Sequence, residues 1–279
     1  MKIKNVILIC AVLAGGGYWI VQNNPNALSL LEQYIDNGEI LTFEARYTPE
    51  RILDQFSKEL ALGEKTFQRS ELKFYPYAFL DVKYSTADKR TKEGVLLWSL
   101  FDGEMVINCE TWENTHGFED AINAQATRND FKILNALAKN KGKASLEQLQ
   151  RDLQVEADIL QPWLDESKAK YLVVQKGNEI QLHFQNPRLL VVPQTSIMQS
   201  IVTKPYSQAQ KMPRNYSFNQ IEKTAQAAFG QDFTIRNKKE LFLPVYSIEI
   251  LNPDGSVLTT EWNALNGQRM IPRYLTNTP

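Results

Sequence analysis

The sequence predicts an α+β fold with an N-terminal membrane anchor, two small helix-on-antiparallel-sheet modules related by internal duplication, and a unit of another kind between them. Three observations predict this fold. The chain begins with an apolar run, a pattern over Thr48–Gly103 recurs in shortened form over Ser217–Gly267, and residues 127–184 have mainly helical periodicity. Spacing that repeats along a chain is typical of a duplicated structural unit.

Residues 1–22 have the features of a membrane anchor. Lys2 and Lys4 precede a stretch, Val6–Val21, that is apolar or glycine throughout. With Ile3 included, residues 3–21 are long enough to contact and cross a lipid bilayer as a slightly short helix. Signal-peptide cleavage after Ala14 would leave an apolar run behind, and a lipoprotein signal would need a small residue before Cys10. We therefore predict an uncleaved anchor.

The charges that flank this anchor predict its orientation. Both early lysines lie on one side, whereas four acidic residues precede the first basic residue, Arg46, on the other side. The positive-inside rule then places the N-terminus in the cytoplasm and the body outside it, which in a bacterium is the periplasm. A short linker helix is expected over residues 23–38.

The first module is expected over residues 39–125. A half-buried strand over 41–47 leads to a helix that Thr48 caps and Pro49 begins, and this helix should end near Gly63. Strands should follow near residues 78–84, 95–100 and 104–109, with a tight turn at Asp102-Gly103. The expected product is an antiparallel meander that carries its helix on one face.

The second module is expected over residues 216–272, before a polar tail at 273–279. Ser217 precedes its helix, and strands over 245–251 and 257–262 are joined by a turn at Asn252–Gly255. The spacing from cap to strand proline, and from Trp98 or Trp262 to the next turn glycine, is nearly the same in both modules. Residues 186–215 hold four prolines and are predicted to be a linker.

Both modules, at 48–107 and 217–271, resemble the PepSY family of small extracytoplasmic domains. The resemblance rests on Val245–Ile250, on Asp254-Gly255 and on Trp262–Gln268. The family often closes this hairpin with aspartate-alanine, followed by glycine and an acid, where this chain has Asn263 and Gln268. The resemblance implies binding or inhibition of a partner protein, and no catalytic residue carries over.

Residues 126–185 form the unit between the modules, and the pattern over 127–184 resembles a winged-helix domain. Three helical patterns, the second beginning at Ser145 and the third containing Pro162, precede two strands at 171–175 and 179–184. That resemblance implies DNA reading by the third helix. The stretch from Val155 to Lys170 nevertheless holds four acids against two lysines, which would repel phosphate. We therefore do not expect a nucleic-acid partner.

Other observations exclude common chemistries. The chain has a formal charge of −1, which gives no long-range field for nucleic acid, and two cysteines, Cys10 and Cys109, which support neither a disulfide framework nor a zinc site. It lacks a Walker loop, GxGxxG, HExxH and a Gly-x-Ser-x-Gly elbow. We predict no catalytic residue, cofactor or metal ligand. The candidate interface residues are Trp112, His116 and Trp163.

The sequence therefore favours a non-enzymatic protein-binding, adaptor or assembly component of a bacterial envelope, with a protein partner. An alternative is a membrane-tethered transcriptional regulator whose winged helix works in the cytoplasm. A third is a hydrolase-like enzyme that uses His116, because a histidine among acids can transfer protons near neutral pH. The oligomeric state is left open.

Overall fold

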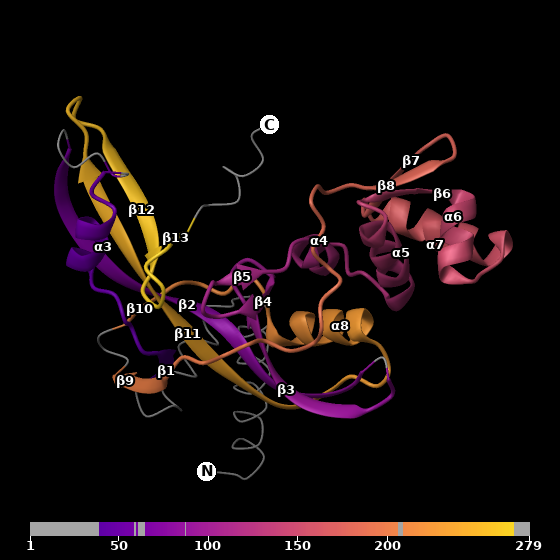
Figure 1. Ribbon diagram of the computed structural model, residues 1–279, viewed down its shortest axis with the longest axis horizontal. Coiled ribbons are helices and arrows are strands. Elements are labelled where there is room, and N and C mark those ends of the chain that lie inside the picture. Colours follow the sequence, from indigo (N-terminus) through magenta and orange to yellow (C-terminus); the bar gives the residue numbers. More distant parts are fainter. Residues whose placement is uncertain (1–38, 59, 61–64, 87, 206–208, 271–279) are drawn as a thin grey trace, which may run out of the picture.

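The protein is a mixed α+β structure with one large sheet and six helices in the part that the computed structural model describes (Figure 1). The described residues are 39–58, 60, 65–86, 88–205 and 209–270. The predicted anchor, linker helix and tail lie outside them. Among the described helices, none combines the length and the apolar character that a membrane span requires.

Two long antiparallel strands, β2 (Thr66–Ser85) and β11 (Thr234–Leu251), form the centre of the large sheet. Tyr75 pairs with Leu243 near the middle of this ladder. The sheet order is β13-β12-β11-β2-β3-β4-β5. The outer strands on this path are β3 (Thr91–Ser99), β4 (Met105–Asn108), β5 (Glu113–Asn114), β12 (Val257–Asn263) and β13 (Arg269–Met270).

Both central strands are much longer than the sequence predicts, and a proline lies in the middle of each. Pro76 pairs with Phe242, and Pro244 pairs with Phe74. The two proline carbonyls accept hydrogen bonds on the outer side of the strand, at 3.0 Å each from the N–H groups of Leu100 and Ala264. The C=O and the N–H of one residue in a strand point to the same side, so the position without an N–H also faces outward at each proline. The strand changes from one outer neighbour to the next at this point, and no hydrogen bond of the ladder is therefore lost. The strands predicted near 78–84 and over 245–251 begin much earlier than expected, at Thr66 and Thr234.

Short strands flank the centre on both sides. β1 (Glu39–Phe43) lies parallel to β11 and antiparallel to β9 (Ile201–Pro205), while β10 (Gln210–Lys211) lies parallel to β2. The segment that the sequence predicts as a linker therefore contains two strands of the sheet. Its Thr195 is also buried, and its hydroxyl donates to the Val106 carbonyl at 2.6 Å.

Each of the two segments predicted as modules has a helix that begins at the predicted hydroxyl cap, although their strands belong to one sheet. Thr48 caps α3 (Pro49–Gln55), and Ser217 caps α8 (Phe218–Phe229), which also has a capping box with Gln220. Both predicted caps are confirmed. α3 ends at Gln55, earlier than the glycine that the sequence favoured.

Each helix packs on strands of the other predicted module, which differs from the predicted packing. Ile52 of α3 lies in one cluster with Ile248 and Trp262 of the β11–β12 hairpin. Ile221 of α8 lies in the cluster of Trp98 on β3. The length of the central strands explains this exchange. The first half of β2 pairs with the second half of β11, so a helix that leads into β2 meets the other module's hairpin.

The turns that follow Trp98 and Trp262 have matching backbone hydrogen bonds. Ser99 N–H donates to Glu104 C=O at 2.8 Å, and Asn263 N–H donates to Gln268 C=O at 2.9 Å. Each turn also accepts a backbone hydrogen bond from a tyrosine that directly precedes a helix cap. Tyr216, before Ser217, donates its N–H to Leu100 C=O at 3.0 Å, and Tyr47, before Thr48, donates its N–H to Ala264 C=O at 2.9 Å.

The central unit holds three helices and a three-stranded antiparallel sheet at one end of the molecule (Figure 1). Buried Asp130, at 1% exposure, accepts hydrogen bonds from Ser167 at 2.5 Å and from Lys170 at 2.7 Å, which joins the first helix to the third. Burial alone would raise the pKa of Asp130, but these bonds and those from Thr127 outweigh burial and lower it. In chain order the elements are α4 (Phe118–Asn123), which precedes the unit, then α5 (Arg128–Lys139), β6 (Lys143–Ser145), α6 (Leu146–Leu153), α7 (Ala157–Ala169), β7 (Val173–Lys176) and β8 (Glu179–Leu182).

Candidate functional site

Trp112, the first of the predicted interface residues, packs inside the molecule. Its half-buried ring lies edge-on to Phe43 of β1, with ring centroids 6.2 Å apart, and edge-on to Tyr77 of β2, at 5.6 Å. It belongs to the cluster on the sheet face around Tyr75 and Leu243. Trp112 thus joins the end of the sheet to β1.

His116 lies where the chain returns from the central unit. Its backbone pairs with Arg188, with N···O distances of 3.3 and 2.9 Å, and its ring lies 6.2 Å from that of Phe184. Among the described residues, its Nδ1 has no hydrogen-bond partner. Gly117 follows with φ 111°, and a Cβ there would lie 2.4 Å from the Phe184 ring. His116 and Gly117 thus fit tightly against this returning segment.

Trp163 packs in a different part of the molecule from Trp112 and His116. It is half-buried on α7 at the edge of the largest hydrophobic cluster, and Lys132 Nζ of α5 lies 4.6 Å from its ring centroid. Trp112 contacts a different cluster. The structure therefore does not bring the three predicted interface residues together into one surface.

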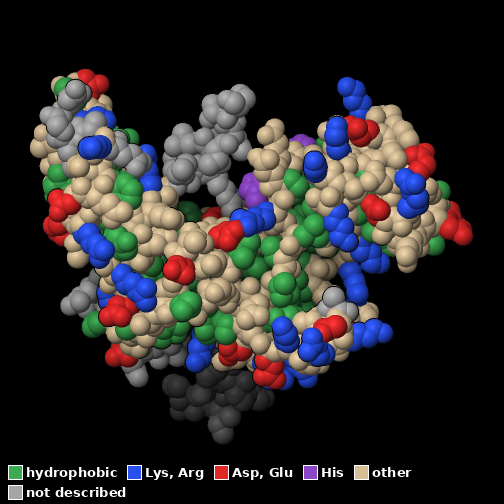
Figure 2. Space-filling model, viewed as in Figure 1, with side chains coloured by type: hydrophobic (Ala, Val, Ile, Leu, Met, Phe, Trp, Pro, Cys, Tyr) green, Lys and Arg blue, Asp and Glu red, His purple; other side chains and the backbone are tan. Residues whose placement is uncertain are grey.

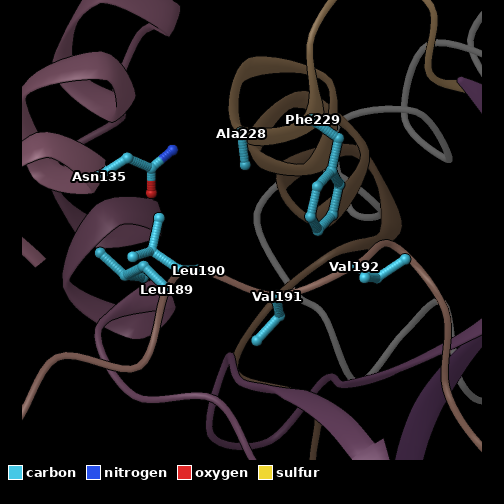
Figure 3. A pocket seen from close by; sticks show the side chains of 7 residues that line it. All are labelled: Asn135, Leu189, Leu190, Val191, Val192, Ala228 and Phe229. Atoms are coloured by element: carbon cyan, nitrogen blue, oxygen red, sulfur yellow. The ribbon is translucent and has the colours of Figure 1, made fainter. Parts of the chain in front are cut away.

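A groove of about 300 Å³ lies between α5, α8 and the extended segment 189–192 (Figure 3). Among the described residues that line it, Asn135 has the only polar side chain. Leu190 and Val192 are 49% and 60% exposed, although both are apolar. The remaining lining residues are Leu189, Val191, Ala228 and Phe229.

The molecular surface around the groove is part apolar and part charged. Figure 2 shows hydrophobic side chains exposed near the centre of one face, with lysine and arginine side chains toward the central unit. None of the described residues that line the groove has a titratable side chain. Such a lining can bury apolar groups and can offer one amide, but it supplies no nucleophile and no acid or base.

The buried polar groups outside the groove hold elements in place. Glu104 is 1% exposed, and its carboxylate accepts from the Thr115 hydroxyl at 2.5 Å and from the N–H groups of Gly117 and Glu119 at 2.9 and 3.1 Å. It therefore fixes the start of α4. Burial raises the pKa of the Cys109 thiol to about 12, which makes it a poor nucleophile. Within the described ranges, no group of three or more histidine, cysteine or acidic side chains could hold a metal ion.

Sequence reasoning missed the groove because its floor lies in the predicted linker. Four prolines in that segment favoured an interpretation as a loop. The signal that could have found it is the apolar run Leu189-Leu190-Val191-Val192, which is too hydrophobic for a solvated linker.

The comparisons with known proteins found no counterpart. No protein-family model matches the sequence, and no curated protein or solved structure matches the chain.

Proposed function

We propose that the protein is a non-enzymatic binding, adaptor or assembly component of a bacterial envelope, held in the membrane by residues 3–21 with its body in the periplasm. The observation that carries this proposal is the open apolar groove at Leu190 and Val192, whose described lining residues include no titratable side chain. Exposed contiguous apolar surface on a folded protein is typical of a binding site. The binding partner is a protein.

We further propose that the two modules are copies of one ancestral unit of the PepSY kind. The matching turn bonds, the matched tyrosine contacts and the equivalent placement of Pro76 and Pro244 support this origin. A duplicated binding module fits a protein that holds a partner, and it requires no catalytic group.

The central unit has the element order of a winged helix, and we propose that it serves protein contacts. Exposed residues of α7 include Asp158, Asp165 and Glu166, which would repel a DNA backbone. The membrane-tethered regulator is therefore the second candidate. The hydrolase-like enzyme comes third, because the side chain of His116 has an aromatic neighbour, Phe184, and no hydrogen bond at Nδ1 within the described part of the chain.

Site-specific photocrosslinking in living cells tests the binding function. A photoreactive residue at Val192 should capture a protein partner, whereas the same residue at Val257 should not. The two valines are matched, at 60% and 55% exposure, but Val257 lies at the far end of the β11–β12 hairpin. Equal capture at both positions, or none at Val192, would contradict the proposal.

A topology reporter after Pro279 tests the proposed location independently. An extracytoplasmic C-terminus is the expected result, because the lysines that precede the anchor favour the cytoplasmic side. A cytoplasmic C-terminus would overturn the location and favour the regulator.

A further inference from the structure

We infer that the groove between α5 and α8 takes an acidic protein segment that inserts two or three apolar side chains. This inference rests on the proposed binding function and adds the chemistry of the partner. The floor, the size and the charged rim of the groove support it separately.

The floor of the groove presents apolar side chains at alternate positions. Leu189 is buried at 4% exposure, while Leu190 and Val192 point outward at 49% and 60%. Two tight local bonds hold the backbone in this form: Val191 N–H donates to Leu189 C=O at 2.9 Å, and Gln194 N–H donates to Val192 C=O at 2.7 Å. The exposed pair is therefore held in place before any ligand arrives.

The size of the groove limits its occupant. At about 300 Å³ it lies at the lower end of the range for ligand pockets. Ala228 and Phe229 form its wall on α8, and Asn135 offers an amide on α5 (Figure 3). A few apolar side chains of a short segment fill such a space, with one polar contact to the Asn135 amide.

The rim on α5 is positively charged. Arg128 and Lys139 lie seven positions before Asn135 and four after it, so they share its face of the helix. Lys132 is not counted with them, because its Nζ lies 4.6 Å from the ring centroid of Trp163 on α7. In the described part of the chain, no ion pair involves Arg128 or Lys139. An Arg128 guanidinium nitrogen also comes within 3.5 Å of the point where a side chain on Gly230, next to Phe229, would begin.

The acids of the two helices are engaged elsewhere. Asp130, the only acid of α5, is buried and paired with Lys170, and Glu222 of α8 pairs with Lys238 at 3.2 Å. Asp232 lies just beyond the end of α8 and is exposed. Within the described residues, Arg128 and Lys139 lie beside the groove without an ion-pair partner, while the acids of α5 and α8 are paired, which favours a partner with negative charge beside its apolar anchors.

Peptide binding to the full-length protein in detergent micelles tests this inference. The probe is a dye-labelled peptide of alternating leucine and glutamate, and its twin carries lysine in place of each glutamate. By fluorescence anisotropy, we expect the acidic peptide to bind at least about 10-fold more tightly, with an advantage that salt reduces. Val192→Glu should abolish its binding, and the matched Val257→Glu should not. Lys139→Glu should weaken it several-fold while leaving the unfolding midpoint nearly unchanged.

Three results would overturn the inference. These are equal binding of the two peptides, a loss on Val257→Glu as large as on Val192→Glu, or a second copy of this chain as the species crosslinked at Val192. If a different protein is crosslinked at Val192 in cells and the peptides show no charge preference, the acidic partner is wrong and the binding function stands. If neither experiment detects binding at Val192, both proposals fail.

Discussion

The two hairpin turns share a backbone and differ in what they support. After Trp98, the turn carries the buried carboxylate of Glu104, which binds N–H groups at the start of α4. After Trp262, the equivalent position is Gln268, which is exposed. The same geometry thus serves as a junction to the central unit in one module and as a plain turn in the other. Backbone geometry is repeated, while side-chain function is not.

Replacing the two tryptophans by alanine should give the largest difference in stability between the two hairpins. Both are fully buried, but Trp98 lies in the largest cluster and Trp262 in a small one beneath α3. We expect Trp98→Ala to lower the free energy of unfolding by about 3–5 kcal/mol. Trp262→Ala should cost less, because the short helix above it can move inward. Urea denaturation followed by circular dichroism measures both, and equal losses would mean that the hairpins are energetically equivalent.

The turn glycines come next. Gly103 and Gly267 have φ 76° and 71°, and a Cβ would lie 3.0 Å from Tyr216 in the first case and 2.5 Å from Tyr47 in the second. We expect Gly267→Ala to cost about 2–3 kcal/mol and Gly103→Ala about 1–2 kcal/mol, since both require the left-handed backbone but the clash is worse at Gly267. In a double-mutant cycle, Tyr47→Ala should recover part of the Gly267→Ala loss. Strictly additive losses would contradict the close approach of the Tyr47 ring to Gly267.

Substituting glutamine for Glu104 and glutamate for Gln268 tests whether the two turns have different roles. Glu104→Gln should cost about 2 kcal/mol, because buried charge-assisted hydrogen bonds to the start of α4 are weakened. Gln268→Glu should change stability by no more than about 0.5 kcal/mol, as is usual at an exposed site. Thermal unfolding of both variants provides the measurement. A cost at Gln268 equal to that at Glu104 would remove the proposed difference.

The helix caps give the smallest expected difference. Ser217 and Gln220 cap each other reciprocally, with Ser217 N–H donating to the Gln220 side chain at 2.9 Å. Thr48 accepts a single bond from Arg51 N–H at 3.4 Å. We expect Ser217→Ala to cost about 1 kcal/mol and Thr48→Ala less than that. Amide hydrogen exchange in the first turn of each helix measures the two losses of stability. A larger loss for Thr48→Ala than for Ser217→Ala would mean that helix length matters more than capping.

The parts of the fold that local sequence determines were predictable. Helix caps at Thr48 and Ser217, and the three helices of the central unit, depend on neighbours a few positions apart. The mid-strand prolines were misleading. A strand tolerates a proline where its outer neighbouring strand changes, and that place depends on the tertiary structure. The exchange of α3 and α8 depends on pairing between residues far apart in the chain, which no local pattern encodes.

The candidate site shows the same limit. Trp112, His116 and Trp163 are conspicuous residue types, yet each packs at a different junction. The groove is made by Asn135, Phe229 and residues 189–192, which are ordinary residues brought together by tertiary structure. The apolar run in the predicted linker was the available signal, and the prolines around it concealed its role.

The exchange of the two helices also affects how the chain can fold during synthesis. Thr42 pairs with Phe242, and the central ladder joins β2 to β11, so the contacts that close the sheet span most of the chain. The first module cannot cover its own hairpin until α8 has been made, and α3 has no surface to cover until β12 exists. Such contacts give a high contact order and slow closure, and they leave apolar strands exposed on the nascent chain.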